Sequence, residues 1–347
     1  MNHKNIKNKI SELKLKLFGR EHLVNDLDFK TFEKMKYSLE SHSPPIYIDC
    51  KNFIGEGGFS FVFQSSSNYQ NEKQFATKIL KPNLLKTLGE TEMKWIKKRF
   101  YKECSIQEEL CKIMPDKVVN VYDYGEFKDV LFLQMELMNK TTLQEIIENQ
   151  YFFSFKNKLN IIIKISEGLD QLHSTGFIHR DFKPSNVLFP KGRIFLNKNE
   201  IYENLEVKLS DYGLVKWIHS NSVDYYDGCV VGTPKYMSPE QIMTPGLVDK
   251  RTDIFSFGLV CYELMNGNSP RVFSLDKTLV LDEKTVRENK FRPLSDYISS
   301  TIQIKKSKNP TEEYFNEIIR NCLKEKTKRY NSMKLVSKEL KKIYLVI

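Results

Sequence analysis

The sequence predicts an α+β protein in which a small β-rich region is followed by a larger helical region. From Tyr47 to about Glu136, β-branched and aromatic residues cluster as they do in strands, with one helical stretch at 91–114. The clearest strand-like runs are 59–63, 75–80 and 130–135. After Asn139 the apolar residues recur mostly at helical spacing. The helices expected there are 143–149, 158–174, 253–265, 312–323 and 332–345.

The composition is that of an ordinary folded protein rather than a disordered one. Of the 347 residues, 40% are hydrophobic and 28% are charged, and the length suffices for two folded units with sizeable cores. The net charge of +10 is spread along the chain, which favours a solvated surface. We therefore expect no specific nucleic-acid binding.

Cysteine spacing and hydropathy indicate an intracellular protein, cytoplasmic or nuclear. The six cysteines are far apart and form no Cys-x-x-Cys pair, so neither a disulfide framework nor a zinc site is expected. The N-terminus carries charges throughout and has no apolar run like that of a signal peptide. The longest apolar run, 254–265, contains Glu263 and is too short to span a bilayer. We interpret it as a buried helix and expect no transmembrane segment.

The first 45 residues form a basic extension that is predicted to be helical. An apolar stripe among lysines consists of Ile6, Ile10, Leu13 and Leu17. This stripe fits contact with a membrane or a partner, and it fits packing against the chain's own main domain at least as well. A Ser-Pro-Pro sequence at 43–45 breaks the helical pattern. We therefore predict a boundary there, with a main domain at 46–347 that divides into lobes at about 46–138 and 139–347.

A glycine-rich stretch at 55–62, Gly-Glu-Gly-Gly-Phe-Ser-Phe-Val, is the first candidate for phosphate binding. Glycines let backbone amides approach phosphate oxygens closely. The stretch lacks the Gly-Lys-Ser/Thr ending of a P-loop and a helix directly after it, which argues against that class and against a dinucleotide fold. Strands on both sides favour a β-hairpin lid, and an ordinary hairpin turn is the alternative.

Lys78, on the strand that follows, is a candidate for neutralising phosphate charge. That role requires an acidic partner that holds the ammonium group in place. Glu103 is the favoured partner, because the apolar residues three and seven positions further on mark one buried helical face. Glu108 and Glu109 are the alternatives.

The most specific signal is the sequence His-Arg-Asp-Phe-Lys-Pro-Ser-Asn at 179–186. Asp181 can accept a hydroxyl proton, Lys183 can stabilise a phosphoryl group, and Asn186 can ligate a metal ion. Asp211, after a short strand in Leu-Ser-Asp-Tyr-Gly, supplies a second metal ligand. Magnesium-dependent phosphoryl transfer needs these chemistries in one small volume.

The order of these motifs resembles the signature set of the eukaryotic-type protein kinases over about residues 48–345. The resemblance implies a bilobal protein-kinase-like fold with ATP and Mg²⁺ in the cleft, and catalytic roles for Asp181, Lys183 and Lys78. It places Met135 at the gatekeeper position and the hinge at 136–138. The ATP-binding set that it implies is Ile54, Gly55, Gly57, Gly58, Val62, Ala76, Lys78, Glu103, Met135, Glu136, Met138, Asn186, Leu188 and Asp211. Of these, Asn186 and Asp211 hold the metal.

Further similarities indicate the Ser/Thr subgroup, whose partners are proteins with Ser or Thr acceptors. Lys183 follows Asp181 as in that subgroup, and the segment 232–240, Gly-Thr-Pro-Lys-Tyr-Met-Ser-Pro-Glu, resembles its substrate-docking segment. The resemblance implies that Thr233 contacts both Asp181 and Lys183. It also implies structural roles for an ion pair of Glu240 with Arg329 and for Asp253 beneath the catalytic loop.

Arg180, directly before Asp181, resembles the arrangement in kinases that are switched on by phosphorylation of the activation segment. Lys216 is a second candidate to receive that phosphate. Cys229 stands where a phosphorylated Thr is frequent, so an upstream kinase or autophosphorylation is expected to act elsewhere. The candidates are Ser220, Ser222, Tyr225 and Tyr226, with Asp227 as a source of fixed charge. An insertion at 191–204 is expected to extend a surface hairpin.

An active Ser/Thr protein kinase is the favoured interpretation of these motifs. A pseudokinase scaffold that still binds ATP is the main alternative, and it predicts loss of Lys78, Asp181, Asn186 or Asp211. All four are present. A small-molecule kinase of similar fold is a third possibility, against which the docking segment at 232–240 argues.

Overall fold

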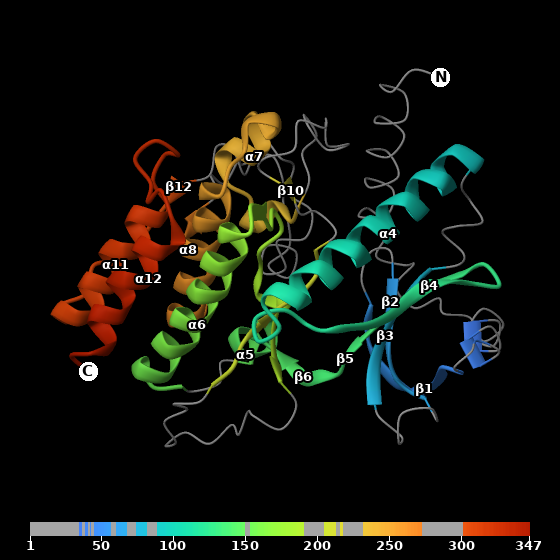
Figure 1. Cartoon of the computed structure of the whole chain (residues 1–347). Coiled ribbons are helices and arrows are strands. Elements are labelled where there is room, and N and C mark those ends of the chain that lie inside the picture. Colours follow the sequence, from blue (N-terminus) through green and yellow to red (C-terminus); the bar gives the residue numbers. More distant parts are fainter. Residues whose placement is uncertain are drawn as a thin grey trace, which may run out of the picture. The chain divides into compact units, whose positions relative to one another are not determined.

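The computed structural model divides into two compact units. It describes residues 35–36, 39–40, 42, 45–56, 60–67, 74–81, 89–149, 153–190, 205–212, 216–217, 232–272 and 301–347. The first unit consists of the described part of Met1–Cys111 together with Val119–Lys140, and the second of Lys112–Val118 with the described part of Thr141–Ile347. A β-sheet dominates the first and helices dominate the second (Figure 1). The predicted α+β fold class is confirmed.

The first unit is built on an antiparallel sheet whose strands run in the order β1-β2-β3-β5-β4. The strands are β1 (Tyr47–Glu56), β2 (Ser60–Ser66), β3 (Gln74–Leu80), β4 (Val121–Phe127) and β5 (Val130–Glu136). A hairpin joins β4 to β5 through Lys128 and Asp129, both at positive φ (45° and 63°). Two left-handed residues in succession are the mark of a type I′ turn, whose twist suits the strands it joins.

Helix α4 (Glu90–Ile113) covers one face of this sheet (Figure 1). Successive residues of a strand point to opposite faces, so Leu131 and Leu133 of β5 share the α4 face. There they join Phe100 and Cys104 of the helix in one buried cluster with Leu80. The helix predicted at 91–114 is therefore confirmed. This packing determines which side of the helix faces the sheet.

The opposite face of the sheet is covered by residues that precede β1. Met35 and Leu39 are fully buried there, in one cluster with Ile46, Ile48, Phe61, Phe63, Ile79, Val130 and Phe132. The His42 ring lies edge-on against Phe132, with 5.0 Å between ring centroids. This part of the predicted N-terminal extension packs against the chain's own sheet. The stripe of Ile6, Ile10, Leu13 and Leu17 lies outside the described residues.

We expect Met35→Ala to lower the free energy of unfolding by about 2–5 kcal/mol, because it removes a fully buried side chain and leaves a cavity. Met243→Ala is the matched control: its side chain is 64% exposed, and its effect should stay within about 0.5 kcal/mol. Denaturant unfolding of the full chain measures both values. Equal effects of the two substitutions would contradict the packing of Met35 on the sheet.

The second unit centres on four long helices. They are α6 (Phe155–Ser174), α8 (Arg251–Asn266), α11 (Pro310–Cys322) and α12 (Met333–Tyr344). Helix α12 packs on α6, and α11 packs on α8 (Figure 1). A Cβ atom on Gly258 would come within 2.9 Å of Cys322 Cβ, so glycine is required where α8 meets α11. Shorter helices are α5 (Leu143–Glu148) and α7 (Pro239–Met243).

The helices predicted after Asn139 are confirmed with ends that differ by up to three residues. Ser154 caps α6 because its hydroxyl accepts the N–H of Asn157, and Gly267 ends α8 at φ 76°. Nearly every residue of α8 is buried, as expected of a core helix. In the part of the chain that the structure describes, no helix has the length and apolar character that crossing a membrane demands.

Short strands and 3-10 turns hold the loops of the second unit, and of these the sequence predicted only a strand directly before Asp211, which is β9 (Lys208–Leu209). The paired strands are β7 (Phe177–Ile178) with β10 (Lys216–Trp217), β8 (Val187–Pro190) with β9 (Lys208–Leu209), and β11 (Arg271–Val272) with β12 (Thr301–Ile302). The remaining elements are β6 (Met138–Thr142), η3 (Pro184–Asn186), η4 (Pro234–Tyr236) and η5 (Pro245–Leu247).

Candidate active site

The backbone of the loop after β7 is held by one buried carboxylate. Asp253, in the first turn of α8, is fully buried and accepts the backbone N–H groups of His179 (2.8 Å) and Arg180 (2.9 Å). Its Oδ2 atom also lies 2.8 Å from His173 Nε2 on α6. Burial acts to raise the pKa of Asp253, but the hydrogen bond from His173, the electrostatic interaction with the His173 and His179 rings and the bond from the His179 N–H lower it overall. Arg180, with φ 64°, takes a left-handed conformation that these bonds stabilise.

Asp181, the next residue, lies at the centre of a three-membered hydrogen-bond network. Lys183 Nζ donates to Asp181 Oδ2 (2.8 Å), and the Thr233 hydroxyl donates to Asp181 Oδ1 (2.7 Å). Lys183 Nζ also donates to Thr233 Oγ1 (3.0 Å). The structure thus brings Thr233 to both residues that the resemblance named. A carboxylate held by a cation and a hydroxyl is fixed in one orientation, as a general base must be.

Gly232 allows this approach of the docking segment to the loop. Its φ of 122° is a conformation that other residues rarely adopt, and a Cβ atom there would come 3.0 Å from the backbone oxygen of Arg180. Gln241 Nε2 in α7 donates to the same oxygen atom (2.8 Å). Gln241 was not predicted from the sequence as a residue of this site. The capping-box spacing from Ser238 to Gln241, which starts α7, is the signal that marks it.

Asn186 and Asp211 lie on two backbone segments that hydrogen bonds join. Asn186 Nδ2 donates to the backbone oxygen of Asp181 (3.0 Å), which leaves Oδ1 as the amide atom able to ligate a cation. The N–H of Ser210 donates to the backbone oxygen of Asn186 (3.0 Å), so Asp211 follows directly beside it. Asp211 has φ 65°, a left-handed conformation that Asp adopts more readily than most residues.

Aromatic packing supports this part of the second unit. Tyr212 is buried, its hydroxyl donates to the backbone oxygen of Leu209 (3.2 Å), and its ring lies 5.4 Å from the His179 ring. His179 also packs edge-on against Phe182. These ring contacts join the loop to the segment that carries Asp211.

In the first unit, Lys78 and Glu103 form an ion pair. Lys78 Nζ on β3 lies 2.6 Å from Glu103 Oε1 on α4. The alternative partners lie elsewhere: Glu108 accepts the Tyr124 hydroxyl (3.1 Å), and Glu109 is exposed. The structure therefore brings together the pair that helical phase favoured.

Neighbouring strands of the sheet carry the other residues predicted to contact ATP in the first unit. Gly55 of β1 is opposite Val62 of β2, and Ala76 of β3 is opposite Met135 of β5. Ile54 is half-buried next to Gly55, and Met138, further along, is buried. Glu136 is held by Asn120, whose Nδ2 and backbone N both donate to its carboxylate (3.0 and 3.2 Å).

Leu188 is half-buried on β8 in the second unit, opposite Lys208. Several other predicted residues fall outside the described part of the chain. They are Gly57, Gly58, the insertion at 191–204, the phosphate-site candidates Ser220, Ser222, Tyr225 and Tyr226, and Asp227 and Cys229. Lys216 is described only as a backbone position in β10.

The pair of Glu240 with Arg329 stabilises the end of the docking segment. Arg329 Nη1 lies 2.6 Å from Glu240 Oε1, and its guanidinium lies 4.9 Å above the Phe255 ring. Burial acts to raise the pKa of Glu240, but the hydrogen bond and charge of Arg329 lower it overall. The carboxylate is thus ionised and paired, as a buried charge must be.

The family described as protein kinase domain matches residues 48–340 of this sequence. The chain therefore belongs to the protein kinase family. A probable serine/threonine-protein kinase of Clostridium perfringens is 30% identical to it over 291 residues, which are 84% of this chain and 37% of that protein. The probable serine/threonine-protein kinase PknB of Corynebacterium glutamicum is 30% identical over 251 residues, 71% of this chain and 35% of that one. Human serine/threonine-protein kinase ULK1 is 31% identical over 226 residues, 63% of this chain and 19% of that one.

These relatives confirm the predicted family and its Ser/Thr subgroup. The chain spans between 19% and 37% of the length of the three relatives. Protein kinases use ATP and act on proteins. The comparisons thus define the family, and the roles of individual residues rest on the geometry described above.

Proposed function

We propose that this chain is an ATP- and Mg²⁺-dependent serine/threonine protein kinase. The observation that carries the proposal is the network in which Asp181 accepts hydrogen bonds from both Lys183 and Thr233. The network places a carboxylate, an ammonium group and the docking segment within hydrogen-bond distance of one another.

Asp181 is proposed as the group that orients the acceptor hydroxyl and takes its proton. In the reaction the hydroxyl oxygen forms a bond to the γ-phosphorus, the bond from that phosphorus to the β–γ bridging oxygen breaks, and ADP leaves. The proton of the hydroxyl passes to Asp181. Lys183, 2.8 Å from Asp181, carries the positive charge that stabilises the transferring phosphoryl group.

Asn186 and Asp211 fit the proposed metal site. Magnesium takes oxygen ligands and usually keeps some of them from substrate phosphates, so one amide and one carboxylate of the protein suffice. Among the described residues, no cluster of three or more His, Cys, Asp or Glu side chains is suited to a metal. When bound, Mg²⁺ supplies charge neutralisation to the phosphates. The hydrogen bond from Asn186 Nδ2 to Asp181 keeps the amide oxygen turned away from the loop backbone.

Lys78 is proposed to hold the α- and β-phosphates of ATP. An ammonium group is a flexible point charge, and the 2.6 Å contact with Glu103 restricts where it lies. The neighbouring strands offer Val62 and Ala76 as apolar contacts for the adenine ring, with the backbone at 136–138 as its hydrogen-bond partner. In this proposal Lys78 neutralises the phosphates, and residues of the strands contact the adenine base.

The pseudokinase and small-molecule-kinase alternatives have less support. A pseudokinase that has lost catalysis would be expected to lack one of the four charged or amide groups, and Lys78, Asp181, Asn186 and Asp211 are all present. The contacts of Thr233 with Asp181 and Lys183 favour a peptide acceptor over a small molecule, since they hold the docking segment against the loop.

Control by the activation segment is a further part of the proposal. Arg180 is buried directly before Asp181, so a phosphate bound to it would act on the same loop. The source is proposed to be an upstream kinase or the enzyme itself. An intracellular setting, cytoplasm or nucleus, accords with the supply of ATP and with the free thiols of Cys104, Cys111, Cys261 and Cys322.

The test is transfer of label from [γ-³²P]ATP to generic basic proteins by the full chain. We expect label on Ser and Thr after acid hydrolysis, none on Tyr, and loss of transfer when Mg²⁺ is chelated. Label on Tyr alone, or transfer only to a small molecule, would contradict the proposed acceptor. Persistence of transfer in excess chelator would contradict the proposed role of the metal.

A further inference from the structure

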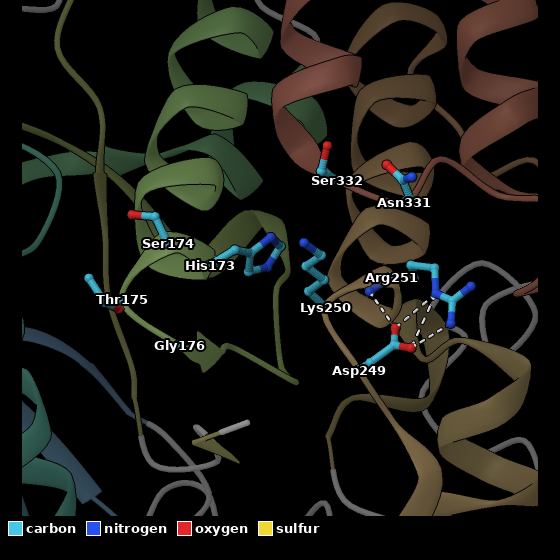
Figure 2. A pocket seen from close by; sticks show the side chains of 9 residues that line it. All are labelled: His173, Ser174, Thr175, Gly176, Asp249, Lys250, Arg251, Asn331 and Ser332. Carbon is cyan, nitrogen blue, oxygen red and sulfur yellow. Dashed lines mark hydrogen bonds and ion pairs between the residues drawn. The ribbon is translucent and has the colours of Figure 1, made fainter. Parts of the chain in front are cut away.

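A pocket lies in the helical unit, lined by none of the residues proposed for catalysis. Its volume is about 850 Å³, within the range typical of small-molecule sites. Figure 2 shows the residues that line it. They come from the end of α6 (His173, Ser174, Thr175 and Gly176), the start of α8 (Asp249, Lys250 and Arg251) and the start of α12 (Asn331 and Ser332).

The cations of the pocket outnumber its single carboxylate. Asp249 is bound by Arg251 and Lys326, with its Oδ2 atom 2.7 Å from Arg251 Nη2 and 3.2 Å from Lys326 Nζ. Burial acts to raise the pKa of Asp249, but the hydrogen bonds from Arg251 and Lys326 lower it to about 2. In the part of the chain that the structure describes, the Lys250 ammonium group makes no hydrogen bond or ion pair. Its charge is therefore available to a ligand.

Two helix ends at the pocket are also arranged for an anion. Ser332 is the N-cap of α12, yet no side-chain hydrogen bond caps this helix, so its first N–H groups and positive dipole end stay available. The carbonyl end of α6 would repel an anion, but its own residues cover it. Ser174 Oγ donates to Gln171 O (2.6 Å), and Thr175 Oγ1 donates to Leu172 O (2.7 Å).

His173 supplies an independent sign of a ligand. It lines the pocket and its side chain is only 3% exposed, and its ring extends from α6 toward Lys250 (Figure 2). Nε2 is bound to Asp253, while Nδ1 has no hydrogen-bond partner in the described part of the chain. A buried polar atom without a partner is rare in folded proteins. With Nε2 donating to Asp253, Nδ1 of the neutral ring is an acceptor, so a hydroxyl group of a molecule bound in the pocket would provide the missing hydrogen bond.

We propose that this pocket binds the phosphate group of a small molecule, either inorganic phosphate or a phosphate monoester. Lys250 and the Ser332 hydroxyl, with the free N–H groups at the start of α12, supply the donors. His173 links this pocket to the catalytic loop. Its Nε2 atom binds Asp253, and Asp253 accepts the backbone N–H groups of His179 and Arg180.

The test is a titration of the full chain, labelled with ¹⁵N-histidine, with inorganic phosphate and separately with glycerol phosphate at constant ionic strength. We expect a saturable shift of the His173 ring signals. Lys250→Met should weaken the midpoint about tenfold or more, because it removes a charged hydrogen-bond donor. Lys328→Met, whose side chain is 70% exposed outside the pocket, should leave the midpoint unchanged.

Two further variants keep the test decisive. Ser332→Asp preserves or improves the cap of α12 but repels a phosphate, so it should weaken binding without loss of folding. Lys78→Met removes the proposed phosphate-binding cation of the ATP site and should leave the His173 shift intact. Absence of a saturable shift, an unchanged midpoint in Lys250→Met, or loss of the shift in Lys78→Met would overturn the proposal. A tighter midpoint for glycerol phosphate than for phosphate identifies a monoester as the ligand, and the reverse identifies the free ion.

Discussion

Asp181→Asn is expected to lower the turnover number about 100- to 10,000-fold, the range that a positioned general base contributes. Asn has the same shape, and its amide oxygen can still accept one hydrogen bond from Lys183 or Thr233. It has no basic oxygen for the proton of the acceptor hydroxyl. The substitution therefore removes proton transfer while it keeps the volume of the side chain.

The fold should survive this change, because the Asp181 side chain is partly exposed and its support comes from Asp253 below the loop. Asp129→Asn is the matched control. Asp129 is exposed in the β4–β5 turn with φ 63°, a conformation that Asn tolerates well, so activity should be unchanged. Steady-state label transfer with ATP and peptide at saturation measures both. Wild-type turnover in Asp181→Asn would contradict its assignment as the base.

Asp253→Ala is expected to lower the free energy of unfolding by about 3–5 kcal/mol, since it removes one partner from a buried, charged network. Three donors, from His173, His179 and Arg180, would lose their acceptor in a fully buried place. The left-handed Arg180 would lose the bond that offsets its backbone strain. Activity should fall with stability, because the same bonds position Asp181.

Asp253→Asn separates these effects if the Ala variant fails to fold. It keeps the shape and one acceptor oxygen but places an NH₂ group against backbone donors, at a cost of about 1–3 kcal/mol. Asp116→Ala is the control, because Asp116 is exposed in a turn and its loss should cost no more than about 0.5 kcal/mol. Chemical unfolding followed by circular dichroism ranks the three. A ranking in which Asp253→Ala equals Asp116→Ala would show that Asp253 does not support the loop.

Much of the candidate site could be predicted from the sequence, because several of its residues are close together in the chain. Asp181, Lys183 and Asn186 lie within six residues, and a short loop with a 3-10 turn keeps them close in any folded form. The partner of Lys78 was accessible for a different reason. Helical phase distinguishes Glu103 from Glu108 and Glu109 when one face of the helix is apolar.

Other features depend on contacts between residues far apart in the chain. The short strands β7, β8 and β10 have two to four residues each, too few for a pattern of alternation. Gln241 reaches the catalytic loop across 61 positions, and only the fold brings it there. The burial of Met35 follows from an apolar sheet face opposite α4, which no single strand reveals.

By itself, the sequence determined the fold class, the family and the identity of the chemical groups in the catalytic loop. Those properties reside in residue types at fixed short spacing, which define both local structure and available chemistry. Only the tertiary structure decided that Gln241 reaches the catalytic loop, that Met35 packs on the sheet, and that His173, Lys250 and Ser332 share a pocket. Each of these depends on where helices pack, and packing is settled by the burial of whole faces rather than by any short run of residues.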